Sequence, residues 1–187
     1  MKADELEIIT YGLDDIIIEN SEGNNLEVTL FDENPYAHNI LFTEEDGVLK
    51  LTFELNFNLF KEEVFRKYIT KRLERARVLI KIPKYKKVVV YGKTIGVTSK
   101  SYDGNLSVYI EKGNIQLNTI KNTTIAHLFL GNVYARALNS ELNLTTKKGR
   151  IVINEKNKKS PFVKSASNTS KKLTVSSIHA NITVVTD

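Results

Sequence analysis

Three short stretches decide the fold of this 187-residue chain: Gly113-Asn-Ile-Gln-Leu, Gly131-Asn-Val-Tyr-Ala and Gly149-Arg-Ile-Val-Ile. Each begins with glycine, continues with a polar residue, and then alternates apolar residues with others. The three glycines lie eighteen residues apart, and a fixed period of this length is typical of repeat architectures. Glycine, and the asparagine that often follows it, tolerate the turn conformations of strand corners. The sequence therefore predicts repeated strands joined at glycine corners.

The repeat predicts an all-β fold, a stacked β-solenoid or β-helix-like array with about 18 residues per coil. One repeat cannot bury its apolar side alone, so stacking is expected to align equivalent residues into buried rows. The predicted rows are Ile115, Val133, Ile151 and Leu117, Ala135, Ile153. The second half of each repeat is less regular, which disfavours a strict hexapeptide left-handed helix.

Further strands are predicted on both sides of this centre. Leu26, Val28 and Leu30 alternate with polar residues, and residues 48–55 do the same after the hairpin signal Glu44-Glu-Asp-Gly47. Short apolar runs that continue from Val78 to the end of the chain, separated by turn residues, predict two strands for each eighteen-residue step.

Residues 59–76 break the β pattern, because their apolar residues recur at intervals of three and four. They predict one short amphipathic helix, with Asn58 as its N-cap. We expect its apolar face to cover one end of the array rather than to bind a membrane surface or a partner.

We expect one domain over residues 1–187. It would comprise acidic N-terminal strands at 1–58, the helix at 59–76 and the repeat region at 78–187. The stretch 156–172 is rich in Lys, Ser and Asn and lacks an apolar period, so we expect a long surface loop, with Phe162 and Val163 holding it to the body.

The net charge of +5 conceals an asymmetry along the chain. Residues 1–60 carry a net charge of −12, residues 61–93 carry +9, and residues 94–187 carry +8. A basic surface attracts nucleic acid or anionic lipid. The alternative, which we favour, is that the acidic third packs beside the basic remainder and the two fields largely cancel.

No cysteine is present, which excludes disulfides and thiolate metal sites, and no apolar run is long enough to cross a bilayer. The acidic start at residues 1–7 lacks the features of a secretory signal, so we expect a cytoplasmic protein. A cell-surface or periplasmic location is the alternative if a leader has been removed.

The sequence carries no recognisable catalytic, cofactor or metal motif. His38, His127 and His179 stand alone, and we expect each to be a surface or hydrogen-bonded histidine rather than a metal ligand. Asp103 is expected to be a turn residue. We therefore predict a protein that is not an enzyme and holds no cofactor and no metal.

The only candidate site is a basic face on the expected helix, and it suggests polyanion binding as an alternative function. Its residues are Arg66, Lys67, Lys71, Arg72 and Arg75.

The Gly-Asn-Ile/Val starts, together with Val78–Lys84 leading into Val88–Gly92, resemble the bacterial putative-adhesin β-strand repeat family. That family is related to autotransporter-adhesin head domains with a Gly-Ile-Asn motif. The resemblance covers roughly residues 14–55 and 78–187 and implies an all-β stack with no catalytic residues to transfer.

We accordingly expect a non-catalytic structural or binding module that presents a sheet surface to a protein or polysaccharide partner. A carbohydrate-active enzyme on a β-helix is the alternative that fold analogy leaves open.

Overall fold

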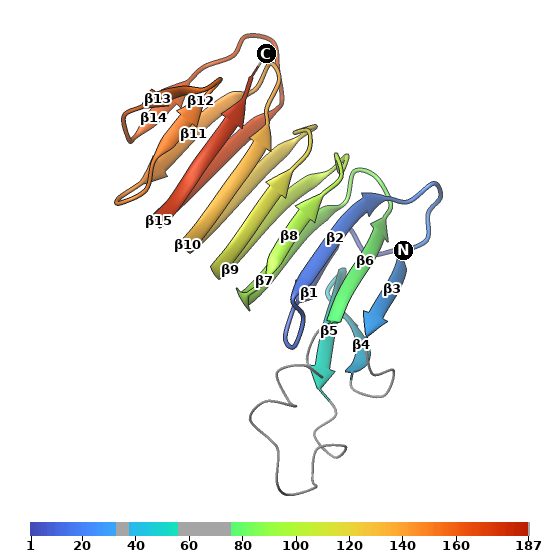
Figure 1. The fold of residues 1–187 in the computed structure, drawn as a ribbon. Coiled ribbons are helices and arrows are strands. Elements are labelled where there is room, and N and C mark those ends of the chain that lie inside the picture. The colour runs from blue at the N-terminus through green and yellow to red at the C-terminus, as the bar shows by residue number, and fades with distance from the viewer. Residues whose placement is uncertain (33–37, 56–75, 187) are drawn as a thin grey trace, which may run out of the picture.

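The computed structural model describes residues 1–32, 38–55 and 76–186, and every regular element in this part of the chain is a β-strand (Figure 1). The all-β expectation is therefore confirmed. The strands are β1 (Glu5–Ile9), β2 (Asp15–Asn20), β3 (Glu27–Asp32), β4 (His38–Glu45), β5 (Val48–Leu55), β6 (Ala76–Ile82), β7 (Lys87–Thr94), β8 (Gly96–Ser99), β9 (Asn105–Leu117), β10 (Thr123–Arg136), β11 (Glu141–Thr146), β12 (Ile151–Ile153), β13 (Lys156–Lys158), β14 (Phe162–Lys164) and β15 (Lys172–Val185).

These strands form one mixed, mostly parallel sheet. Its longest path of hydrogen-bonded neighbours runs β13-β12-β15-β10-β9-β7-β1-β5-β4. The described antiparallel pairs are β3 with β6, β4 with β5, β11 with β14 and β12 with β13, and they lie toward the two ends of the sheet. Parallel pairing dominates the middle, where both backbone edges of each strand are satisfied by neighbours.

The long strands β9, β10 and β15 bend in the middle. In β9 the buried side chains are Leu106, Val108 and Ile110 before the bend, but Ile115 and Leu117 after it. Because a strand buries alternate residues on one face, this shift from even to odd numbers shows that the strand turns its direction near Gly113. The sheet thus has a first arm before the bends and a second arm after them.

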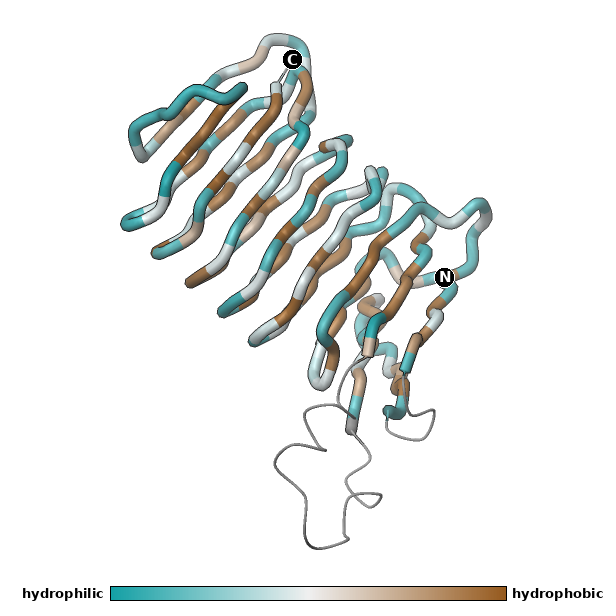
Figure 2. Tube along the Cα trace, viewed as in Figure 1, coloured by the Kyte–Doolittle hydropathy of each residue, from teal (hydrophilic) through white to brown (hydrophobic). Residues whose placement is uncertain are grey.

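Both arms bury their apolar side chains in one common core. Hydrophobic and hydrophilic positions alternate along the strands of each arm, as the hydropathy colouring in Figure 2 shows. The rows predicted from the repeat are buried: Ile115, Val133, Ile151, Leu117, Ala135 and Ile153 are each at most 6% exposed.

The neighbouring strands β9 and β10 pair in a register in which partner residues are eighteen positions apart in the sequence. Val133 of β10 lies opposite Ile115 of β9, and Gly131 lies opposite Gly113. The third member of the predicted row is not their neighbour, however. Ile182 of β15 lies between Val133 and Ile151, because β15 is inserted between β10 and β12.

The expected stacked β-solenoid of 18-residue coils is therefore wrong. The described strands join into one mixed sheet in which β15, β1 and β2 break the chain order and four antiparallel pairs occur. The equal spacing of Gly113, Gly131 and Gly149 suggested three successive coils, but a strand from residues 172–185 separates the second from the third. The expected helix at 59–76 lies outside the described residues, apart from Ala76, which begins β6.

The polar stretch at 156–172 is not one long loop. Lys156–Lys158 and Phe162–Lys164 are the short strands β13 and β14, which pair with the outer edges of β12 and β11. The ring of Phe162 packs on the core as expected, whereas Val163 is exposed. Backbone pairing rather than apolar patterning creates these two strands, so the sequence did not reveal them.

Ion pairs confirm that the acidic and basic parts of the chain pack together. Five acidic residues from the first 27 residues pair with basic residues between 77 and 100 at nitrogen–oxygen distances of 2.6 to 3.7 Å. The pairs are Asp4–Lys86, Glu5–Lys87, Asp15–Arg77, Glu19–Lys100 and Glu27–Lys81. Several are cross-strand partners in register, as in Glu5 with Lys87.

Candidate binding surface

Three aromatic rings form a stack on the outer side of the first arm. Tyr91 of β7 and Tyr109 of β9 lie with ring centroids 5.5 Å apart and planes inclined by 17°. Tyr109 and His127 of β10 lie 5.2 Å apart with planes inclined by only 4°. We call these three residues the aromatic stack.

Sheet register explains why these rings meet. Tyr91 lies directly opposite Tyr109, and Tyr109 lies directly opposite His127. Their neighbours along each strand, such as Val90 and Val108, point into the core, so the three rings point outward. The stack therefore follows from the same eighteen-residue register that aligns the buried rows.

A hollow of about 780 Å³ lies at the Tyr91 end of the stack, and we call it the tyrosine hollow. It is lined by Ile9–Asp14, Tyr91–Thr94 and Tyr109. Because the rings lie nearly parallel on adjacent strands, one face of Tyr91 contacts Tyr109 and the other is directed toward β1. The hollow thus holds an aromatic face on one side and the turn after β1 on the other.

Hydrogen bonds hold the wall of the tyrosine hollow in place. The backbone N–H and the side-chain hydroxyl of Thr10 both donate to the carbonyl of Tyr91, each at 3.0 Å. The imidazole Nε2 of His38 lies 2.9 Å from the carbonyl oxygen of Gly12. These contacts tie the turn after β1 to β7 and β4, so the hollow is formed before any ligand arrives.

The phenol of Tyr91 remains protonated well above neutral pH. Burial raises the pKa of Tyr91 above its ordinary value, and the nearby Glu7 carboxylate and Tyr109 phenol raise it further. The Tyr91 hydroxyl is therefore available as a hydrogen-bond donor across the physiological range.

A second, smaller hollow of about 460 Å³, the histidine hollow, lies at the other end of the stack. It is lined by Gly92, Tyr109–Glu111, His127–Phe129 and Ser176–Ile178. The ring of Phe129, more than half exposed, lies 5.3 Å from the ring of His179 on β15. Gly92 and Tyr109 line both hollows, so the two hollows adjoin each other on the same surface.

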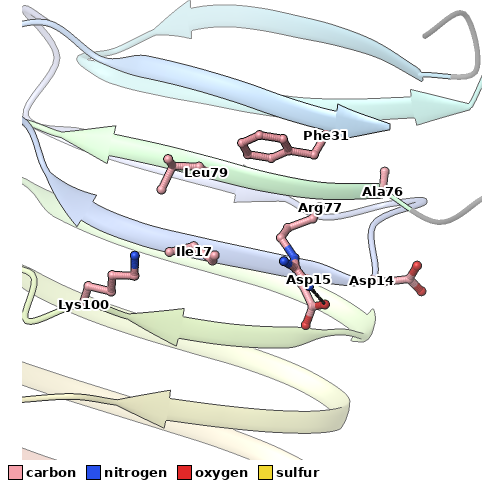
Figure 3. Close-up of a pocket in the computed structure, with 8 residues that line it drawn as sticks. All are labelled: Asp14, Asp15, Ile17, Phe31, Ala76, Arg77, Leu79 and Lys100. Atoms are coloured by element: carbon pink, nitrogen blue, oxygen red, sulfur yellow. Dashed lines mark ion pairs between the residues drawn. The ribbon is translucent and has the colours of Figure 1, made fainter. Parts of the chain in front are cut away.

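A third hollow, of about 770 Å³, lies on the outer side of the second arm (Figure 3). Ile17, Phe31 and Leu79 form its apolar floor, and its charged groups pair across strands. Arg77 lies 3.7 Å from Asp15, and Lys100 lies 2.6 Å from Glu19, a residue beyond the lining. We call it the charged hollow. Since these charged side chains already neutralise one another, a ligand there would compete with existing ion pairs.

The structure places the sequence-predicted residues differently. The basic face of Arg66, Lys67, Lys71, Arg72 and Arg75 lies outside the described residues. His38 is buried, with Nδ1 2.5 Å from the Asp32 carboxylate, while His127 belongs to the aromatic stack and His179 contacts Phe129. Asp103 accepts a hydrogen bond from Asn122 between strands.

The aromatic stack was missed at the sequence level, although a signal for it exists. Tyr91, Tyr109 and His127 are themselves eighteen residues apart. The glycine period, extended to the preceding strands, places Tyr91, Tyr109 and His127 in one row.

Within residues 1–32, 38–55 and 76–186, no group of three or more metal-ligating His, Cys, Asp or Glu side chains comes together. In the same part of the chain, no helix has the length and hydropathy needed to span a bilayer.

Comparison with solved structures identifies the fold. The chain is similar to a putative cell adhesion protein from Clostridium sporogenes, with a TM-score of 0.63 and 12% identity over 99% of this chain and 92% of that one. It also aligns with a putative adhesin from Bacteroides fragilis at a TM-score of 0.42 and 11% identity, covering 100% of this chain and 93% of the other. At this identity the first likeness shows a shared fold.

No protein-family model matches the chain, and no curated protein matches it by sequence. The class of protein is thus defined by its fold, an all-β sheet shared with a protein described in terms of cell adhesion.

Proposed function

We propose that this protein is a non-catalytic binding module whose outer sheet surface contacts a polysaccharide or protein partner. The observation that carries the proposal is the aromatic stack, which places three rings in a row on an outward face between two hollows. Aromatic rings that stack on ligands supply much of the contact energy at binding sites.

The shared fold supports an adhesion role. A protein of this fold is described as a putative cell adhesion protein, and this chain aligns with nearly all of it. We also propose membership of the putative-adhesin β-strand repeat family, on the glycine-asparagine pairs that begin at Gly113 and Gly131, at the bends of β9 and β10, and on their in-register pairing.

The test is a pair of arrays probed with fluorescently labelled protein. One array carries immobilised glycans and the other carries matrix proteins such as collagen, fibronectin and laminin. We expect saturable binding on one array, reduced in a Tyr109→Ala variant whose thermal unfolding matches wild type. An absence of saturable binding on both arrays contradicts the proposal.

Location is a separate part of the proposal. Adhesion to an external partner requires exposure at the cell surface, whereas an internal scaffold would remain in the cytoplasm. Fractionation of the native cells, followed by immunoblotting and protease accessibility on intact cells, separates these two locations.

A further inference from the structure

We propose that the tyrosine hollow is a binding site for one pyranose ring of a neutral oligosaccharide, stacked on Tyr91. This inference rests on the proposed binding function and names the ligand class of its site. It depends on the shape of the hollow, the chemistry of its rim and its position within the sheet.

The hollow offers one flat apolar face with polar groups around it. Tyr91 is 39% exposed, and its cross-strand partner Ile9 of β1 lies beside the base of its second face, so the outer part of that ring is the part open to a ligand. Tyr11, which is 55% exposed, lies on the opposite wall in the turn after β1. A pyranose ring has the complementary character, since its C–H face is apolar and its rim carries hydroxyl groups.

The polar groups around the hollow favour a neutral ligand. Lys93 and Asp14 both line it and carry opposite charges, while Thr94 and the tyrosine hydroxyls add groups that both donate and accept hydrogen bonds. A strongly anionic or cationic ligand would be attracted by one of the two charges and repelled by the other. The hydroxyl groups of a neutral sugar can accept a hydrogen bond from Lys93 and donate one to Asp14.

The position of the hollow disfavours a peptide that binds by strand addition. The hollow lies over β1, β7 and β9, in the interior of the sheet. β7 pairs with β1 on one side and with β9 on the other, so its backbone groups are already used. A peptide strand binds at an open edge, whereas a ring stacks on side chains and needs no backbone partner.

The neighbouring histidine hollow can hold the adjoining sugar unit. Both hollows share Gly92 and Tyr109 in their lining, and they follow each other across the strands. An oligosaccharide would therefore extend from Tyr91 toward Phe129, and affinity should rise from a disaccharide to a tetrasaccharide.

The wall of the hollow is rigid enough to favour binding. The Thr10 bonds to the Tyr91 carbonyl and the His38 contact with Gly12 fix the turn before the ligand arrives. Binding then costs little conformational entropy in the loop, so more of the stacking energy contributes to the affinity.

The experiment titrates the wild-type chain, labelled with ¹⁵N, with cellotetraose, laminaritetraose, maltotetraose, mannotetraose and chitotetraose at millimolar concentrations. We expect at least one of them to shift the amide signals of residues 9–14 and 91–94. Tyr91→Ala and Tyr11→Ala should each weaken that sugar about tenfold, which corresponds to about 1.4 kcal/mol. Tyr91→Phe, which keeps the ring, should remain within about threefold of wild type.

Tyr134→Ala is the matched control. Tyr134 is 44% exposed, similar to Tyr91, but it lies on the second arm of β10, opposite Gln116. The affinity of this variant should equal that of wild type. Circular dichroism and thermal unfolding confirm that each variant is folded before its titration.

Several results would overturn the inference. They are the absence of shifts with all five sugars, shifts confined to other residues, equal losses for Tyr134→Ala and Tyr91→Ala, or tighter binding of an acidic sugar such as tetragalacturonate. If array binding survives in Tyr91→Ala, this site is wrong and the binding module stands. If neither the arrays nor the sugars show binding, both proposals fail.

Discussion

The centre of the sheet and the strands inserted beside it obey different rules. In the centre, β7, β9 and β10 follow one another in chain order, and partners such as Asn114 and Asn132 are eighteen residues apart. The inserted strands β1 and β15 join partners much farther away. Asn181 of β15 bonds to Asn132, 49 residues away, and Asp4, just before β1, bonds to Lys86, 82 residues away.

Both kinds of strand are equally buried, yet they bend differently. In the centre, Gly113 and Gly131 take φ values of +152° and +144° at the bend. The equivalent position in β15 is Ala180, which does not take a positive φ and whose N–H donates to the Ser177 hydroxyl at 2.7 Å. The difference shows that a periodic sequence marks the centre only, whereas the inserted strand reaches the same register through its own local contacts.

Removal of β15 is the strongest test of this comparison. A variant that ends at residue 171 leaves β10, β11 and β12 without their shared neighbour. It also exposes the core around Val133 and Leu142, so we expect complete loss of the cooperative unfolding transition. Circular dichroism during urea titration measures this unfolding transition.

The control for this truncation is Thr183→Ala. Thr183 lies on β15 with its side chain only half-buried, so this variant should unfold like wild type. A truncated protein that keeps a cooperative transition would show that the centre folds without the inserted strand.

Gly131→Ala tests the bend in the centre. A Cβ atom at this position would lie 1.7 Å from the carbonyl oxygen of Gly113, in a backbone conformation that side chains rarely adopt. The two neighbouring strands must separate to admit it, so we expect a loss of about 3 kcal/mol or more in the free energy of unfolding.

Urea unfolding of Gly131→Ala should be compared with that of Gly23→Ala. A Cβ at Gly23 meets no atom within 4 Å, so that variant should change stability by less than about 0.5 kcal/mol. Equal stability of the two variants would mean that the bend does not require glycine.

Much of the fold could be predicted from the sequence because alternation and spacing leave a direct mark. Residues 48–55 were predicted as a strand and are β5, and the alternating Leu26–Leu30 run marks β3. The pairing of Val133 with Ile115 follows from the glycine period alone. These features depend on local patterns of residues, which can be seen in a single sequence.

The insertion of β15 could not be predicted, because an alternating strand such as Leu173–Val175 fits beside many others. Only the three-dimensional packing selects β10 and β12 as its neighbours. The aromatic stack escaped prediction for a related reason. The charged residues of 59–76 form a local pattern and lie outside the described residues, whereas the aromatic stack arises when three ordinary residues of separate strands are brought into register.

Tyr102, between β8 and β9, tests how the segment between β6 and β7 is held at the edge of the centre. Its buried hydroxyl lies 3.1 and 3.0 Å from the carbonyl oxygens of Pro83 and Lys86 and shares its one proton between them. Tyr102→Phe removes both hydrogen bonds and should cost about 1–3 kcal/mol at neutral pH, measured by urea unfolding.

The pH dependence of this variant gives a second test. Burial raises the pKa of Tyr102 above its ordinary value of 10.0. The contribution of the neutral phenol to stability is therefore fully present below pH 10 and is lost as the pH rises above it. The stability difference between wild type and Tyr102→Phe should shrink above pH 10. A constant difference would contradict the raised pKa.

The asparagine ladder provides the finest comparison between the centre and the inserted strand. Asn132 donates to the Asn114 side chain at 2.9 Å within the centre, and accepts from Asn181 of β15 at 3.3 Å. All three side chains are exposed at the bends, so Asn132→Ala should cost only about 0.5–1.5 kcal/mol.

Double-mutant cycles separate the two bonds of Asn132. We expect a larger coupling energy for Asn132 with Asn114 than for Asn132 with Asn181, because the first bond is shorter and Asn181 also accepts from the backbone N–H of Arg150 at 3.2 Å. Urea unfolding of the single and double alanine variants measures both couplings, and Asn143→Ala, at an exposed position of β11, serves as the control. A larger coupling to Asn181 would reverse the comparison and make the inserted strand the more tightly bound neighbour at the bend.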